Sequence, residues 1–569
     1  MKALNIGQSD FKNMIEDDNY FVDKSLFIKE VIETQASVLL IPRPRRFGKT
    51  LNLSMLRYYF DRNRPGNEKL FEDLQIWQSG DDIKRHCCRY PVIHISFKDA
   101  KANDWNGTLE HIKTEIANAF RSHFYIMESG LLQEFEKEHF MGLLTRKAVV
   151  SDFETSLKQV SEYLYRYHRE KVVILIDEYD TPIQTGHKKF YDEVITFMRN
   201  LLSGAFKDNS FLYKGVITGI LRVSKESIFS GLNNLDVYSV LNYGFSDKFG
   251  FTQAETDKIL DDFDLREHSE GIGKWYNGYR MGNTDNIYNP WSILNYVTKY
   301  REGFRPYWTQ TSANELIKRE MEKRDADTLR EDILRLINGE KIVKEIEENF
   351  VFPDLNGRKS LFWTLLLYSG YLTIGEKVHG NDYELKIPNF EIKTVFQKTI
   401  LEWFEAEIKI EKLILNETMH FLTGGQLSEF EEGFRRIMGD TLSYYDTVGP
   451  NEYVYHSYLL GLLAVLGDDY VIRSNRESGS GRYDILLIPH DKGKNGVVIE
   501  IKTLEHRPSI EEKVMHEKIN GALEEALGQI EKHEYYKELV AHGIPEDNII
   551  KVPVVFVGKK PYVLKIKTG

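Results

Sequence analysis

Residues 37–56, SVLLIPRPRRFGKTLNLSML, decide the fold that the sequence predicts for the first part of the chain. An apolar run is followed by a short basic loop and then by apolar residues spaced three and four apart, which indicates a buried strand, a loop and an amphipathic helix. Further apolar runs of strand length follow at 91–97, 171–177 and 211–220. Their alternation with helical patterns predicts an α/β domain in which a parallel sheet has helices on both faces.

The loop ends in Gly48, Lys49 and Thr50, which fit the second half of the phosphate-binding motif G-x-x-x-x-G-K-[ST]. In that motif backbone amides hold phosphates, the lysine reaches the β- and γ-phosphates, and the hydroxyl binds Mg²⁺. Arg43 stands where the first glycine belongs, although a β-carbon resists the torsions that glycine allows. A chance Gly-Lys-Thr at a helix start is the alternative. The predicted nucleotide-binding run is Arg45, Arg46, Phe47, Gly48, Lys49 and Thr50.

The apolar run at 171–177 ends in Asp177, and Glu178 follows it. An Asp at a strand end can hold the Mg²⁺ shell, and the Glu can polarise an attacking water. A solvated pair of carboxylates is the alternative, but two such motifs at strand ends together favour an ATP site. After the next strand, Thr218 is a candidate polar sensor and Arg222 can neutralise γ-phosphate charge; each can equally be an ordinary strand-end residue.

Near the C-terminus, GRYDILLIP and GVVIEIKTL read as neighbouring strands that carry Asp484, Glu500 and Lys502. Alternation places Glu500 and Lys502 on one face of their strand. Two carboxylates can hold Mg²⁺, and a nearby lysine can activate a water for attack on a phosphodiester. Glu-Ile-Lys occurs three times, but only this copy follows an apolar strand with an Asp on another strand. Glu477, in a glycine-rich turn, is a further candidate carboxylate. The predicted Mg²⁺ ligands are Thr50, Asp177, Asp484 and Glu500.

Six stretches in order resemble the bacterial AAA-ATPase-like family. They are YFVDKSLFIKE (20–30), RPRRFGKTLNLSML (43–56), VILIDEYDTPI (173–183), ITGILRVSKESIFSGLNNL (217–235), KWYNGYRMG (274–282) and YNPWSILNY (288–296). The loop without its first glycine is typical of that family, and the resemblance leaves open whether its basic residues Arg43, Arg45, Arg46 and Lys49 supply the missing phosphate contacts or face a partner. The stretch from VYHSYLLGLL to GRYDILLIP, then VVIEIKTL and ALGQIEKHEYY, resembles the PD-(D/E)XK nuclease domain fused to this family.

These patterns predict three domains. They are a P-loop AAA-ATPase-like domain at 1–250, a mainly helical middle domain at 251–442, and a restriction-endonuclease-like α/β domain of the PD-(D/E)XK class at 443–569. A length of 569 residues allows three or four domains. Aromatic residues in the middle domain are expected to pack in a core.

The composition excludes several classes of protein. Lys+Arg 75 against Asp+Glu 87 leaves a net charge of −12, so the sequence does not predict a uniformly basic nucleic-acid-binding surface. The two cysteines, Cys87 and Cys88, are adjacent and cannot form a loop-closing disulfide with each other. No apolar stretch approaches the roughly 20 residues that a bilayer span needs. We therefore expect a cytoplasmic protein without a membrane segment, and the family resemblance implies that it is bacterial.

The predicted function is that of an enzyme, an ATPase and Mg²⁺-dependent nuclease. Its nucleotide state would control hydrolysis of nucleic acid, with DNA favoured over RNA. The first alternative is a regulatory or signalling ATPase whose C-terminal module binds nucleic acid without cleaving it. The second is a scaffold in which both sites are vestigial. Each of these interpretations is compatible with a homo-oligomer.

Overall fold

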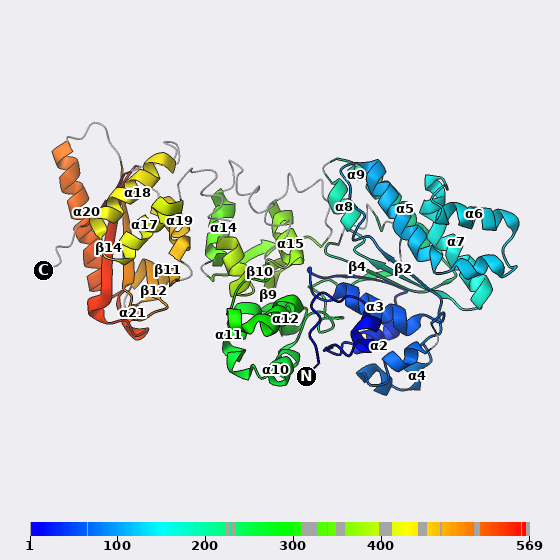
Figure 1. The fold of residues 1–569 in the computed structure, drawn as a ribbon. Helices are drawn as coiled ribbons and strands as arrows, with labels where there is room; N and C mark the ends of the chain where they lie inside the picture. Colours follow the sequence, from blue (N-terminus) through cyan, green and yellow to red (C-terminus); the bar gives the residue numbers. More distant parts are fainter. Residues whose placement is uncertain are drawn as a thin grey trace. The chain divides into compact units, whose positions relative to one another are not determined.

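The computed structural model describes residues 2–64, 66–187, 189–222, 228–229, 232, 234–308, 327–337, 339–348, 359–397, 412–441, 452–466, 469–478, 481–505, 512–558 and 560–564 (Figure 1). Contacts divide the chain into two compact units. Unit 1 is Met1–Trp308 with Val343–Glu391, and unit 2 is Thr309–Ile342 with Ile392–Gly569. This division assigns parts of the predicted middle domain, 251–442, to each unit, so the three-domain boundaries stay a prediction.

The first sheet of unit 1 is parallel throughout and has the strand order β2-β3-β4-β1-β5. Its strands are β1 (Val38–Pro42), β2 (Val92–Ser96), β3 (Val172–Asp177), β4 (Leu212–Gly219) and β5 (Leu235–Val237). Every residue of β1 and β3 is buried, which explains their unbroken apolar runs. The four strands that the sequence predicted are confirmed. Strand β4 lies between β1 and β3, so its tip adjoins both predicted phosphate motifs.

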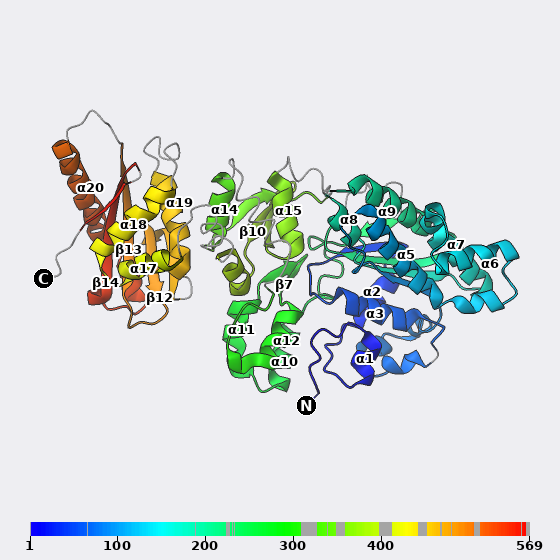
Figure 2. The same ribbon diagram turned by 45° about the horizontal axis from the view of Figure 1, so that its top comes forward.

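Helices cover both faces of this sheet, as predicted. Helix α3 (Lys49–Phe60) contacts β2, β3 and β4, whereas α5 (Trp105–Arg121) contacts β2 and α7 (Val150–His168) contacts β3. Figures 1 and 2 show α2 (Leu26–Glu33) and α3 on one side of the sheet and α5, α7 and α9 (Tyr191–Phe206) on the other. The shorter helices of this part are α1 (Phe11–Glu16), α4 (Asp81–Lys84), α6 (Glu134–Leu144) and α8 (Thr181–Gly186).

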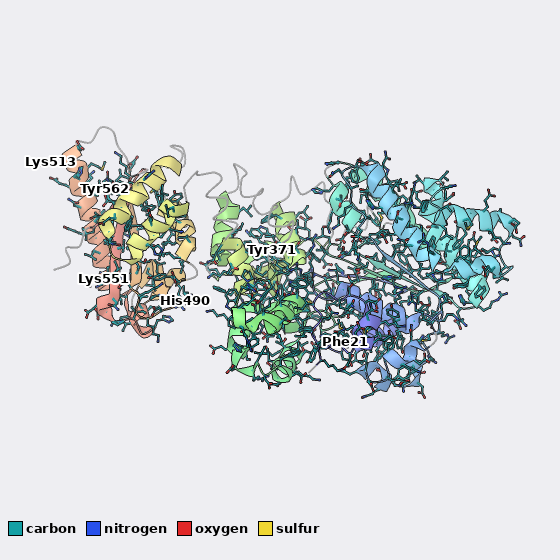
Figure 3. All side chains as sticks on the ribbon, in the orientation of Figure 1. Phe21, Tyr371, His490, Lys513, Lys551 and Tyr562 are labelled. Atoms are coloured by element: carbon teal, nitrogen blue, oxygen red, sulfur yellow. The ribbon has the colours of Figure 1, made fainter. Side chains whose placement is uncertain are left out.

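The remainder of unit 1 contains helices and short strands. The helices are α10 (Gln253–Asp262), α11 (Ser269–Tyr276), α12 (Pro290–Lys299) and α15 (Lys359–Ser369). The strands form a hairpin of β6 (Tyr279–Met281) with β7 (Thr284–Ile287), and a sheet β8-β10-β9 of Ile342–Glu345, Asp382–Lys386 and Thr373–His379. The sequence did not predict these strands, because most of them are short and β7 and β9 are partly exposed. Its aromatic residues pack in a core as expected; Tyr371, labelled in Figure 3, is 1% exposed.

Unit 2 is built on a mixed sheet in the order β11-β12-β13-β14-β15, in which only β13 and β14 pair in parallel. The strands are β11 (Tyr470–Ser478), β12 (Gly481–Pro489), β13 (Gly496–Leu504), β14 (Ile549–Val557) and β15 (Lys560–Val563). The helices are α14 (Asp327–Ile337), α17 (Lys412–Thr423), α18 (Leu427–Thr441), α19 (Glu452–Leu463), α20 (Glu512–Lys532) and α21 (Lys537–Ala541).

Helix α18 packs on this second sheet, although the sequence placed it in the middle domain. It contacts β15, and Arg435 Nε donates to the carbonyl of Pro561 at 3.0 Å. The compact C-terminal unit therefore contains elements that precede residue 443. Among the helices that the structure describes, none has both the length and the apolar character needed to cross a membrane.

Candidate functional site

Three of the predicted nucleotide-site residues meet at the carboxyl ends of β3 and β4. The buried Asp177 ends β3, and its Oδ2 accepts a hydrogen bond from Thr50 Oγ1 at 2.7 Å. Its Oδ1 accepts one from Thr218 Oγ1, at the tip of β4, at 2.6 Å. The strand order makes this meeting possible, because β4 separates the strand of the phosphate loop from the strand of Asp177. One carboxylate is thus oriented by hydroxyls from two different elements.

The phosphate loop has the local geometry of an anion site. Gly48 precedes α3 with φ +86°, a left-handed conformation that glycine adopts without a steric penalty. A Cβ added at Gly48 would meet no atom of the described residues within 4 Å, so space lies open beside the helix N-terminus. Backbone amides at such a terminus bind phosphate oxygens, and the Thr50 hydroxyl and Asp177 carboxylate are oxygen donors of the type Mg²⁺ prefers. The donor set therefore fits a nucleotide with its metal.

Lys49 lies across the loop. Its Nζ donates to the carbonyls of Arg43 at 3.0 Å and Pro44 at 2.9 Å, and the residue is only 6% exposed. Burial lowers the pKa of Lys49, and the Asp177 carboxylate is the strongest influence in the opposite direction. The lysine is thus held among the groups that a phosphate would contact.

Glu178 follows Asp177 in a left-handed backbone conformation, with φ +50°. Burial raises its pKa, and the neighbouring charge of Asp177 raises it further. Its Oε2 accepts a hydrogen bond from Thr181 Oγ1 at 3.2 Å. A carboxylate with a raised pKa is a stronger base and is therefore better suited to accept a proton from water.

Asp180 is a residue for which sequence reasoning assigned no role. It is 1% exposed, and its Oδ2 accepts hydrogen bonds from the amides of Ile220 at 3.0 Å and Leu221 at 2.9 Å, and from Gln184 Nε2 at 2.7 Å. Asp180 therefore ties the end of β3 to the segment that follows Thr218. The Asp-Glu-Tyr-Asp run was the available signal, but its last carboxylate could not be linked to residues 40 positions away by pattern alone.

Arg43 does not point to a phosphate, so one of the proposed compensating cations has a different task. It is fully buried, and its Nη1 donates to the carbonyls of Pro42 at 2.9 Å and Tyr238 at 2.5 Å. Its Nη2 donates to the carbonyl of Phe245 at 3.0 Å, and the guanidinium lies 5.1 Å from the ring centre of Phe249. The Arg43 side chain, which replaces the first glycine of the motif, therefore joins β1 to the segment after β5.

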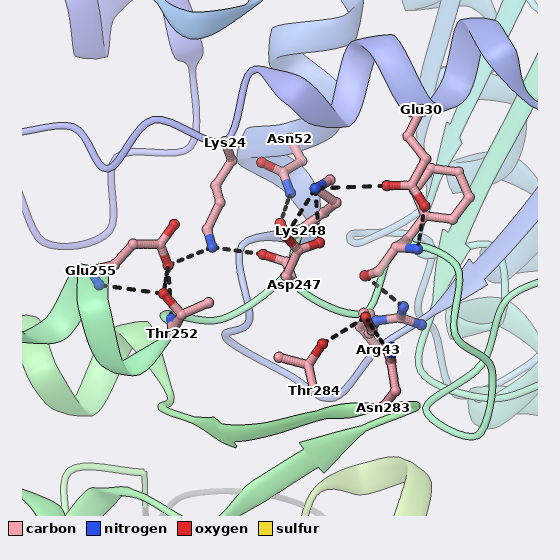
Figure 4. A network of polar contacts seen from close by, with 12 residues as sticks. Lys24, Glu30, Arg43, Asn52, Asp247, Lys248, Thr252, Glu255, Asn283 and Thr284 are labelled. Atoms are coloured by element: carbon pink, nitrogen blue, oxygen red, sulfur yellow. Dashed lines mark hydrogen bonds and ion pairs between the residues drawn. The ribbon is translucent and has the colours of Figure 1, made fainter.

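That segment is held by further polar contacts, which Figure 4 shows together with Arg43. Lys24 Nζ donates to the carbonyl of Asp247 at 2.8 Å and to Glu255 Oε2 at 2.6 Å. Asn52 of α3 donates to the carbonyl of Lys248 at 2.9 Å. The loop-to-helix region is therefore fastened to residues that lie some 200 positions later in the sequence.

The remaining loop residues also face the later part of unit 1. Arg46 has φ +67°, and its Nη1 donates to the carbonyl of Tyr307 at 3.0 Å. Phe47 is 1% exposed and packs edge-to-face on Tyr279, with ring centres 5.1 Å apart. The half-buried Arg45 makes no side-chain hydrogen bond or ion pair with the residues that the structure describes, whereas its carbonyl accepts from Trp308 Nε1 at 3.4 Å.

Arg222 forms an ion pair with Glu348, with Nη1 and Oε2 2.6 Å apart. Its guanidinium is therefore already matched with a carboxylate. Its contact with the γ-phosphate stays a prediction.

In unit 2 the structure brings Asp484, Glu500 and Lys502 together where β12 and β13 stop pairing. Ile485 pairs with Ile499, and beyond this pair Asp484 Oδ2 accepts a hydrogen bond from the amide of Ile501 at 2.7 Å. Lys502 Nζ lies 3.5 Å from Glu500 Oε1, on the same face of β13. The aspartate side chain thus bridges to the strand that carries the Glu and Lys.

Two neighbouring residues complete the account of this site. His456 of α19 is 5% exposed, and its Nε2 is 3.1 Å from the carbonyl oxygen of Asp484, so it supports the main chain of the site. Glu477 lies on β11 opposite Arg482, but its side chain is outside the described residues. Within the described ranges no three His, Cys, Asp or Glu side chains form a metal-binding group. Mg²⁺ at either site would therefore rely on hydroxyls, phosphates and waters as well as carboxylates.

Comparison with known proteins finds a family match for each of the two parts of the chain that carry these candidate sites. Residues 5–229 match the model of the AAA-ATPase-like family, described as "Predicted AAA-ATPase", and residues 450–565 match that of the "PD-(D/E)XK nuclease superfamily". A protein of Azotobacter chroococcum mcd 1, described as "Uncharacterized protein in vnfD 5′ region", is 30% identical over 406 residues, which are 70% of each chain. The chain belongs to the AAA-ATPase-like family and carries a C-terminal PD-(D/E)XK nuclease domain.

Among solved structures, the Walker-type ATPase of Pyrococcus abyssi resembles this AAA-ATPase-like protein with 16% identity and a TM-score of 0.35. The match covers 66% of this chain and 94% of the other. The two domains are those of a hydrolytic enzyme, an ATPase joined to a nuclease.

Proposed function

We propose that this AAA-ATPase-like protein is a cytoplasmic bacterial enzyme in which bound ATP controls the Mg²⁺-dependent hydrolysis of nucleic-acid phosphodiesters, with DNA favoured over RNA. The observation that carries the proposal is the presence of two oxygen-rich sites in one chain. One is Asp177 between the Thr50 and Thr218 hydroxyls, and the other is Asp484 beside Glu500 and Lys502.

In the nucleotide site, Thr50 and Asp177 would hold Mg²⁺ while the loop amides and Lys49 bind phosphates. Mg²⁺, when bound, supplies positive charge that stabilises the phosphates and the leaving oxygen. Thr218 orients the Asp177 carboxylate, since its hydroxyl occupies one of the two oxygens. Glu178, whose pKa burial raises, would accept a proton from the attacking water.

In the nuclease site, Asp484 and Glu500 would be the carboxylate ligands, and Glu477 is a further candidate. The Ile501 amide holds one oxygen of Asp484, so the direction of this carboxylate is set before any metal arrives. Lys502, 3.5 Å from Glu500, would orient and activate the water that attacks the phosphodiester. Preorganised groups of this kind require little rearrangement during the reaction.

The test is cleavage of double-stranded DNA, single-stranded DNA and RNA by the full-length chain with Mg²⁺, with and without ATP. Lys502→Ala and Glu500→Ala should each abolish cleavage, and EDTA should do the same. Lys513→Ala is the matched control, because Lys513 lies on the exposed start of α20 in the same unit (Figure 3). Cleavage that survives in Lys502→Ala would refute the nuclease half. Nucleotide binding without cleavage under any condition would favour the regulatory ATPase instead.

A further inference from the structure

The chain passes between the two units at three points, after Trp308, Ile342 and Glu391. It enters unit 2 at the first and the last of these points, and those two are fastened to each other inside unit 1. Glu391 Oε1 accepts hydrogen bonds from the amide of Tyr307 at 2.6 Å and the amide of Trp308 at 2.9 Å. Its Oε2 accepts one from Ser292 Oγ, on α12, at 2.7 Å, and the residue is 1% exposed. A single buried carboxylate therefore holds together the two crossings at which the chain enters unit 2.

The crossing after Trp308 is also bonded to the phosphate loop. Arg46 Nη1 donates to the carbonyl of Tyr307, and its guanidinium stacks 4.2 Å from the ring centre of Trp291. Trp291 Nε1 donates to that same carbonyl at 3.2 Å. Trp308 Nε1 donates to the carbonyl of Arg45 at 3.4 Å. The Tyr307 carbonyl thus accepts from the phosphate loop, and the Tyr307 amide donates to Glu391.

These contacts begin very close to the expected phosphates. Arg45 and Arg46 precede Gly48 by three and two positions, and Arg46 is held in a left-handed conformation that costs a non-glycine residue about 1–2 kcal/mol. Such a conformation persists because its surroundings impose it. A ligand that repositions the loop must therefore also shift the partners of Arg46 and of the Arg45 carbonyl, since a close-packed interior transmits displacements.

We propose that this set of residues, the crossing clasp, transmits occupancy of the phosphate loop to the two chain segments that lead into unit 2. The crossing clasp consists of Arg45, Arg46, Trp291, Ser292, Tyr307, Trp308 and Glu391. Its response to nucleotide is independent of the nuclease, while its effect on cleavage rests on the proposed function. Glu391 is a positioning residue, because its contacts are with the crossing and not with nucleotide or nucleic acid.

The first experiment measures hydrogen exchange of the full-length chain at the Tyr307 and Trp308 amides, with and without saturating Mg²⁺ and a non-hydrolysable ATP analogue. Loop ordering should slow exchange there by roughly fivefold or more, because both amides donate to Glu391. Unchanged exchange in nucleotide-saturated protein would overturn the proposal, whatever the nuclease does. Changed exchange with ATP-independent cleavage would support the crossing clasp and refute the nucleotide control of cleavage.

The second experiment compares variants in the same exchange measurement and in the ratio of cleavage rates with and without ATP. Glu391→Ala should still bind nucleotide but lose both responses, whereas Glu391→Gln keeps an acceptor for the two amides and should retain them. Ser292→Ala removes one donor and should weaken the exchange response, which keeps the test decisive if Glu391→Ala does not fold.

The matched control is Glu136→Ala on α6. Glu136 is also buried, accepts from the amide of Gln133 and pairs with Arg166, but it has no contact with the crossing clasp. It should keep both responses. A full exchange response in both Glu391→Ala and Ser292→Ala would overturn the proposal, and so would an equal loss in Glu136→Ala.

Discussion

Restoring the missing glycine of the phosphate loop, by Arg43→Gly, should damage the protein rather than improve it. The motif alone suggests that glycine would relax the loop and tighten nucleotide binding. In the structure, however, Arg43 supplies hydrogen bonds to the carbonyls of Pro42, Tyr238 and Phe245. Removing the side chain leaves these carbonyls without that donor and opens a cavity beside β1.

The magnitude follows from those three bonds and from the burial of their donor. Hydrogen bonds to a charged group contribute about 1.5–3 kcal/mol each, but they are not additive. Burial lowers the pKa of Arg43 to about 9, which shows that the charged form pays a desolvation penalty that offsets part of the gain. Each buried carbonyl left without its donor costs about 1–3 kcal/mol. We expect a loss near 4 kcal/mol.

Hydrogen exchange of the β1 amides is the suitable assay, because it reports local stability without requiring the whole chain to unfold in two states. A loss of about 4 kcal/mol corresponds to a fall in protection of about 10³-fold. Arg62→Gly is the control, since the Arg62 side chain is exposed and donates to the carbonyl of His168, at 3.2 Å. Unchanged β1 protection in Arg43→Gly, or tighter nucleotide binding, would refute the reasoning.

Three further predictions concern single groups. Burial raises the pKa of Glu391 from 4.5 to about 7, so the folded protein binds this proton more tightly than the unfolded chain does. Unit 1 should therefore lose up to about 3 kcal/mol of stability as pH rises from 4.5 to 7. Urea titrations should show a smaller dependence of stability on pH in Glu391→Gln. Gly48→Ala should cost about 1–2 kcal/mol in thermal unfolding from the left-handed backbone alone, while its Cβ enters the open space and weakens ATP binding in a fluorescence titration. Asp484→Asn keeps an acceptor for the Ile501 amide, so its circular dichroism should match the unaltered protein while Mg²⁺-dependent cleavage falls by at least about 10²-fold.

The parallel strands of unit 1 could be predicted from sequence because both of their faces are buried, which leaves a continuous apolar run. β1 and β3 show this in its simplest form. β5 has only three residues, and its pattern carries no comparable signal. The strands β6 to β10 are short or half-exposed, so the chain there resembles its helical surroundings. What distinguished predictable from unpredictable strands was therefore burial on both faces.

The two candidate sites also differed in how much of each could be predicted from the sequence. Glu500 and Lys502 are two positions apart on one strand, so alternation alone predicted their common face, and the structure has their side chains 3.5 Å apart. The contact of Thr218 with Asp177 depends on strand order, which a periodic pattern does not contain. The role of Arg43 could not be predicted either. Its acceptors are backbone carbonyls, which every residue has, so the residue type does not show where they lie.

The extent of the nucleotide unit follows from this last point. The AAA-ATPase-like match ends at residue 229, yet the carbonyls that hold Arg43 belong to Tyr238 and Phe245, and Phe47 packs on Tyr279. A loop that lacks its first glycine cannot rely on its own torsions to keep its shape, so its conformation must be imposed from outside. The structure supplies that support from the later part of unit 1, up to Glu391. The part of the chain that shapes the phosphate site is therefore longer than the part that carries its motifs, and it ends where the chain crosses toward the nuclease.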